Sequence, residues 1–138
     1  MSKNVKVRKL LIYFGGLLLI IWGTSHLVPT NNVVRGFGNI TVDNIRIIKM
    51  EWINEGLTLI FIGLLTIAVT LICDLKSKIA KAVYILSFIM LVAMSVLSLL
   101  TGFKIDFLPF KLCPFIFMTS GLMILQGNFY KRNTDNKI

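Results

Sequence analysis

Charged residues are scarce in this sequence, and acidic ones are the scarcest. Asp and Glu number 6 against 15 Lys and Arg, so only 15% of the 138 residues are charged and the net charge is +9. Soluble domains carry about 25% charged residues. Apolar residues make up 56% of the chain without counting glycine. That share excludes both an aqueous globular domain and a disordered chain, and it predicts a membrane protein.

The residues and motifs of most known chemistries are also missing. The chain has one histidine and two cysteines, and no CxxC, HExxH, P-loop, GxSxG or dinucleotide-binding glycine motif. Cys73 and Cys113 fall at opposite ends of predicted spans, too far apart for a disulfide. We therefore expect no metal, no cofactor and no catalytic motif. Basic residues spread over both membrane faces argue against nucleic acid as a partner.

Four apolar stretches are long enough to cross a hydrocarbon core of about 30 Å as helices. They contain no Asp, Glu, Lys or Arg, which excludes the buried ionisable groups of coupled transporters. The sequence thus predicts an all-α membrane protein with a single domain, residues 1–138. Its predicted spans are Leu10–Val28, Gly56–Cys73, Ala82–Thr101 and Leu112–Tyr130.

Two local features refine these boundaries. Asp43 is suited to cap a helix that starts near Asn44 and continues into the second span, with its first turns outside the hydrocarbon core. Pro114 falls in the first turn of the fourth predicted span, where proline is tolerated.

Basic residues near the span ends predict the orientation. Ten Lys and Arg flank the spans on the side of the N-terminus and five on the other side, which predicts cytoplasmic termini and an inner-membrane location. A second interpretation stays open, because the N-terminal segment also fits a secretory signal: a basic region to Lys9, an apolar run to Trp22, and small residues Gly23 and Ser25 before a cleavage point.

Small and hydroxyl residues gather on one stripe of each predicted span, as expected for helices that pack closely in lipid. The stripes predict an up-down-up-down bundle of four transmembrane helices; a lined pore or a ligand groove is the alternative. The residues that we expect at the helix contacts are Gly16, Gly23, Gly63, Thr66, Ser87, Ser98, Ser120 and Gly121.

A polar cluster is predicted at the outer end of the bundle. His26 ends the first span, and Glu51, Trp52 and Glu55 open the second, with the two carboxylates one helical turn apart. If the two helices are neighbours, His26 and Glu55 meet at nearly the same depth. The cluster is read in three ways: interfacial anchors, a site for a ligand or lipid headgroup, or a proton-transfer pair. Aromatic residues of the third loop, among them Phe110, either cap this end or dip into the interface.

The segments Gly23-Thr24-Ser25-His26-Leu27 and Glu51-Trp52-Ile53-Asn54-Glu55-Gly56 resemble the first two spans of DoxX-like small four-helix membrane proteins. More distantly, they are similar to the EXPERA fold of sterol isomerases and sigma-2-type receptors. The isomerase resemblance implies an outward-opening pocket in which an acidic residue and a histidine, here Glu55 and His26, serve a lipid-like substrate. The further acidic residues of such a catalyst are absent from these spans.

From the sequence we therefore predict a multi-pass membrane protein that is a non-catalytic binder of a lipid or small hydrophobic molecule, or an accessory protein. Its ligand site would comprise His26, Glu51, Trp52 and Glu55. The alternatives are a membrane enzyme that acts on a lipidic substrate through the Glu55 and His26 pair, and a structural membrane subunit. Membrane lipids are the expected partners, together with a membrane-protein partner or a second copy of the chain.

Overall fold

The computed structural model describes residues 3–103 and 108–129, which form helices joined by short connections, with no strand among them. Four helices are long and apolar enough to cross a membrane, which confirms the prediction of an all-helical protein with four candidate spans. The helices are α1 (Lys3–Leu27), α2 (Thr30–Gly36), α3 (Val42–Ile72), α4 (Lys78–Thr101) and α5 (Leu108–Phe129). The predicted end of the fourth span, Tyr130, lies outside the described residues.

The local signals at the helix starts differ from the predictions in two places. Helix α3 begins at Val42, and Thr41 caps it by accepting a hydrogen bond from the Asn44 amide; the prediction of Asp43 as the cap was wrong. Helix α5 begins four residues before the predicted Leu112, so Pro114 is its seventh residue and lies beyond the first turn. The short helix α2 was not predicted.

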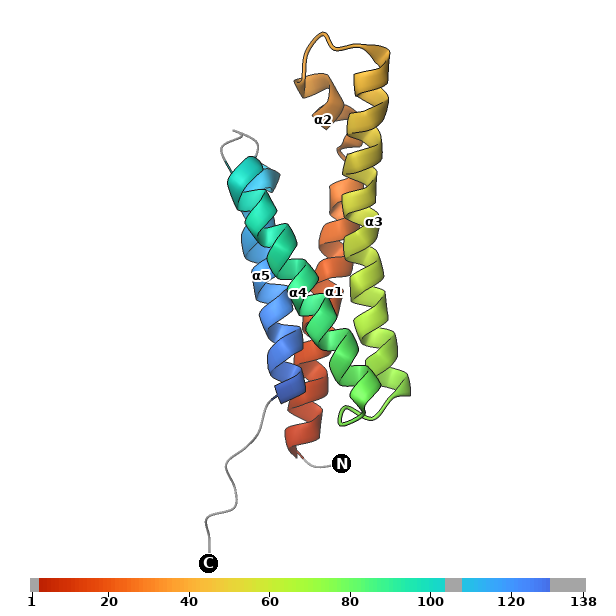
Figure 1. Ribbon diagram of the computed structural model, residues 1–138, viewed down its shortest axis with the longest axis vertical. Coiled ribbons are helices and arrows are strands. Elements are labelled where there is room, and N and C mark those ends of the chain that lie inside the picture. Colours follow the sequence, from red (N-terminus) through yellow and green to blue (C-terminus); the bar gives the residue numbers. More distant parts are fainter. Residues whose placement is uncertain (1–2, 104–107, 130–138) are drawn as a thin grey trace, which may run out of the picture.

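Helix α1 packs against both α3 and α5, and α4 packs mainly against α5 (Figure 1). The glycines on α1 and α3 allow very close approach: a Cβ atom on Gly63 would lie 2.5 Å from the Gly16 carbonyl oxygen, and one on Gly23 would lie 2.7 Å from that of Gly56. The contact nearer the start of α1 is the one nearer the end of α3, so the two helices run in opposite directions.

Polar contacts join the helices at the end opposite α2. Thr70 of α3 and Tyr84 of α4, both fully buried, share a hydrogen bond of 2.8 Å between their hydroxyl groups. Arg8 near the start of α1 donates to the carbonyl oxygens of Gly127 and Asn128 in the last turn of α5. Such carbonyls have no partner within their own helix, so the arginine stabilises the end of α5 against α1.

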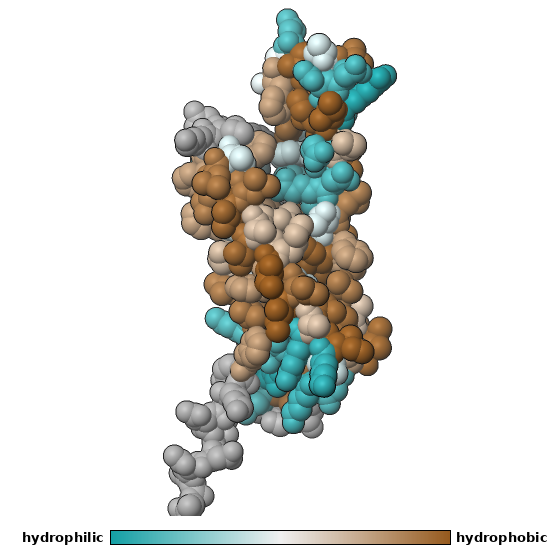
Figure 2. Space-filling view, viewed as in Figure 1, coloured by the Kyte–Doolittle hydropathy of each residue, from teal (hydrophilic) through white to brown (hydrophobic). Residues whose placement is uncertain are grey.

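Polar and apolar surfaces are separated along the long axis of the molecule. Figure 2 shows a broad hydrophobic middle belt, hydrophilic residues gathered at the end opposite α2, and hydrophilic residues mixed with hydrophobic ones toward the end that holds α2. Helix α3, at 31 residues, is about 46 Å long and extends past the tops of α4 and α5 (Figure 1). We call the end that holds α2 the α2 end of the molecule.

Candidate functional site

A groove opens between α3 and α4 toward the α2 end. Helix α4 contacts α3 much less than it contacts α5, and the hydrogen bond between Thr70 of α3 and Tyr84 of α4 lies at the other end of the molecule. The groove has a volume of about 550 Å³. Its walls are Val33, Phe37, Ile47, Ile48, Glu51, Trp52, Asn54, Glu55, Thr58, Met90, Met94, Leu97, Ser98, Thr101, Gly102 and Phe110.

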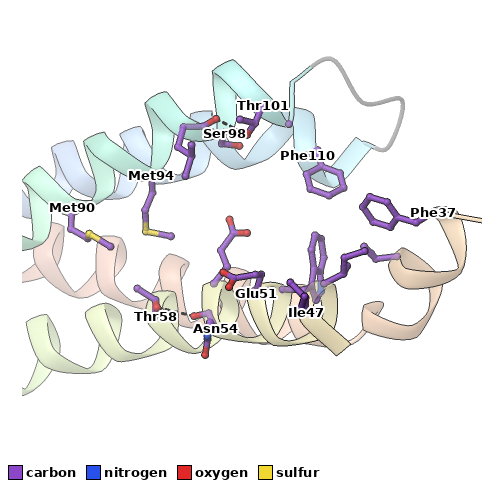
Figure 3. A pocket seen from close by; sticks show the side chains of 16 residues that line it. Phe37, Ile47, Glu51, Asn54, Thr58, Met90, Met94, Ser98, Thr101 and Phe110 are labelled. Atoms are coloured by element: carbon purple, nitrogen blue, oxygen red, sulfur yellow. Dashed lines mark hydrogen bonds between the residues drawn. The ribbon is translucent and has the colours of Figure 1, made fainter. Parts of the chain in front are cut away.

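The two walls differ in character. Figure 3 shows Met90 and Met94 of α4 across from Glu51 and Thr58 of α3. The α4 wall is largely apolar and includes flexible methionines, which adapt to irregular apolar partners. The α3 wall carries the charged and amide groups. An apolar cleft with a few convergent polar groups is the usual form of a ligand site.

Trp52 is fixed at the base of the groove by three contacts. Its indole Nε1 donates a 2.7 Å hydrogen bond to the carbonyl oxygen of His26, which belongs to the last turn of α1 and so lacks a partner within that helix. The indole stacks on the His26 imidazole, with ring centroids 3.7 Å apart, and meets the edge of Phe110 at 5.2 Å. One side chain therefore joins α1, α3 and α5.

His26 and Glu55 come together, as the sequence predicts for neighbouring helices. His26 Nε2 lies 3.3 Å from Glu55 Oε2, within ion-pair distance when the imidazole is protonated. The histidine side chain is only 1% exposed and the glutamate side chain 31% exposed. Neither imidazole nitrogen has a hydrogen-bond partner among the described residues.

Glu55 thus faces two environments. On one side its carboxylate approaches the buried imidazole, and on the other it lines the groove together with Glu51, one helical turn earlier. His26 itself does not line the groove. Among the described residues that line the groove, the charged ones are the two carboxylates Glu51 and Glu55. The groove therefore presents negative charge in an apolar setting.

The predicted packing residues fall into two groups. Gly16 meets Gly63 and Thr66, Gly23 meets Gly56, and Gly121 meets Leu91. Ser120 places its carbonyl beside Gly15 of α1, and Ser87 is 95% buried. Ser98 differs, because it is half-buried and lines the groove.

The α4 wall of the groove was missed by sequence reasoning. Met90, Met94 and Leu97 look like ordinary lipid-facing residues, and only their separation by four and three positions places them on one face. No residue pattern shows that α4 diverges from α3. Phe37, in the first loop, was missed because the short helix that positions it was not foreseen.

The described part of the chain holds no group of three His, Cys, Asp or Glu side chains placed to bind a metal ion. Comparisons with protein-family models, curated proteins and solved structures return no match. The resemblance to DoxX-like proteins therefore stays a prediction, and the site is interpreted from its own geometry.

Proposed function

We propose that this protein binds an amphipathic membrane molecule, with its apolar chain against α4 and a cationic head beside Glu51 and Glu55. The observation that carries the proposal is the pairing of an apolar wall with carboxylates in one groove. Trp52 and Phe110 add aromatic surface beside the carboxylates, and aromatic faces also attract cations. A molecule with an anionic head would meet repulsion from both glutamates.

The proposed topology brings this groove to the outer side of the bilayer. Seven basic residues of the described helices and loops lie at the end opposite α2, and four lie toward the α2 end; the first set is Lys3, Lys6, Arg8, Lys9, Lys76, Lys78 and Lys81, the second Arg35, Arg46, Lys49 and Lys111. The positive-inside rule then makes the first end cytoplasmic. We propose an up-down-up-down bundle in the inner membrane with both termini in the cytoplasm.

The alternative of an enzyme is less well supported by the geometry. A reacting atom in the groove can reach Glu55, but His26 lies behind that carboxylate and does not line the groove. A general acid or base must come within hydrogen-bond reach of the reacting group. The pair is better suited to setting the charge of the groove than to transferring a proton to its contents.

The alternative of a structural subunit is weakened by how the small residues are used. Gly16, Gly23, Gly63 and Gly121 meet partners within the same chain. These stripes are therefore engaged in the fold of one chain, whereas a subunit that assembles through them would leave them exposed.

Native mass spectrometry from nanodiscs tests the proposal with three probes of equal chain length: hexadecyltrimethylammonium, hexadecanol and hexadecyl sulfate. We expect a saturable 1:1 adduct with the cation alone, and affinity about tenfold lower in the Glu51→Gln/Glu55→Gln variant, which corresponds to 1.4 kcal/mol. The matched control is Asp43→Asn, an exposed carboxylate on the same helix that does not line the groove. Equal retention of all three probes, or an equal loss in the control, contradicts the proposal.

A further inference from the structure

The contact between His26 and Glu55 links a buried base to the groove. The imidazole is 1% exposed, yet its Nε2 lies 3.3 Å from a carboxylate that lines the groove and is 31% exposed. A cation in the groove and a protonated imidazole behind it would both use the same carboxylate. Their effects on Glu55 therefore oppose each other.

Among the described residues, few other ionisable groups lie on the helices around the imidazole at the α2 end. On α3, Glu51 is exposed one turn before Glu55. On α5, Cys113 is buried and close enough to Glu55 for their charges to interact, and Lys111 lies two residues before it. On α2, Arg35 is exposed. Glu55 is the carboxylate within ion-pair distance of His26.

Histidine is the side chain whose ordinary charge change falls between pH 5 and 8. We infer that protonation of His26 regulates the affinity of the groove for cations. When the imidazole is neutral, the Glu55 carboxylate is available to a cationic head. When the imidazole is protonated, it pairs with Glu55 and compensates its charge, so the cationic head is released. The inference rests on the proposed function, since it describes how the affinity of that same site is regulated.

Two features of the site suit such a control. Trp52 holds the imidazole in place through the stack on its ring and the hydrogen bond to its backbone carbonyl, so protonation need not move α1. Both ring nitrogens lack hydrogen-bond partners among the described residues, and the charged group that lies within ion-pair distance of the imidazole is Glu55. Thermodynamic reciprocity adds a second expectation: if protons weaken cation binding, cation binding expels a proton.

The test uses the full chain in zwitterionic nanodiscs and the fluorescence of Trp52. Because the chain has two tryptophans, a Trp22→Phe background leaves Trp52 as the reporter at the base of the groove. The probe is a hexadecyl dimethylammonium that carries a nitroxide quencher on its head, so its charge does not change with pH. A neutral nitroxide amide of the same chain length is the matched control.

We expect the affinity for the charged probe to fall about tenfold from pH 8 to pH 5.5, within the range typical of coupled sites. In His26→Gln the affinity should no longer change with pH, and the neutral probe should show no dependence in either protein. The inference is overturned if the affinity of His26→Gln for the charged probe changes with pH as much as that of the parent protein. It is also overturned if the parent protein binds the charged probe selectively with an affinity that does not change with pH.

A measurement without any substitution at the histidine guards against misfolding of that variant. Titration calorimetry with hexadecyltrimethylammonium near pH 6.5, in two buffers with different enthalpies of ionisation, should report proton release on binding. Binding without proton release overturns the inference that His26 regulates the groove, and it leaves the proposed function unaffected. Equal quenching by the charged and neutral probes at every pH contradicts the proposed function itself, so the two failures are distinguishable.

Discussion

The indole of Trp52 covers the last turn of α1 by stacking on the ring of His26 and donating a hydrogen bond to the carbonyl oxygen of the same residue. The next carbonyl, that of Leu27, accepts a hydrogen bond from the Thr30 hydroxyl. These two bonds satisfy groups that a helix end otherwise leaves to solvent. The histidine backbone is thereby held where its side chain meets Glu55.

Replacing Trp52 with phenylalanine should loosen this end of α1. The substitution keeps an aromatic ring but removes the donor to the buried His26 carbonyl, a loss of about 1–3 kcal/mol in the free energy of unfolding. Thermal unfolding in detergent, followed by circular dichroism, measures the effect. Leu57→Ala is the matched control, because Leu57 is on the same helix and 51% exposed. Equal stability of Trp52→Phe and the parent protein would show that the hydrogen bond contributes little.

Replacing Gly63 with alanine should separate α1 from α3. The new Cβ would lie 2.5 Å from the Gly16 carbonyl and 2.7 Å from Ile20 Cγ1, and overpacking of this kind costs about 1–3 kcal/mol. Gly36→Ala is the control, since a Cβ there meets no atom within 4 Å. The same unfolding assay should rank Gly63→Ala clearly below Gly36→Ala. Comparable stabilities would mean that α1 and α3 do not approach as closely as described.

The bond between Thr70 and Tyr84 should be measurable by a double-mutant cycle. Tyr84→Phe, Thr70→Val and the double variant together isolate the pair, and hydrogen bonds between transmembrane helices average about 0.6 kcal/mol in such cycles. We expect a coupling energy of about 0.6–1.7 kcal/mol in a reversible unfolding assay. A coupling near zero would contradict the contact that joins α3 to α4 at the end opposite the groove.

The helices were predictable because their signals are local and strong. Uncharged apolar runs of span length and stripes of small residues mark each long helix, and the Gly16–Gly63 and Gly23–Gly56 contacts follow from those stripes. The contact between His26 and Glu55 also followed, since antiparallel neighbours joined by one loop bring those positions to the same depth.

The groove was not predictable, because it depends on the angle between two helices. In the sequence, Ser98 belongs to the same kind of stripe as Ser120, yet Ser120 is buried and Ser98 lines the groove. The divergence of α4 from α3 decides between the two outcomes, and no single residue encodes it. The cap at Thr41 was missed for a simpler reason: Thr41 and Asp43 are both good N-cap residues, two positions apart.

Photocrosslinking tests most directly whether an amphiphile occupies the groove. The probe is a hexadecyltrimethylammonium with a diazirine in mid-chain, applied to the protein in nanodiscs, and labelled peptides of α4 are mapped by mass spectrometry. We expect labelling of Met90, Met94 and Leu97, which line the groove, with competition by unlabelled cation and loss of labelling in Glu51→Gln/Glu55→Gln. Labelling of Leu86 and Ile89, exposed on the same helix and not part of the groove, to the same extent and without competition would contradict it.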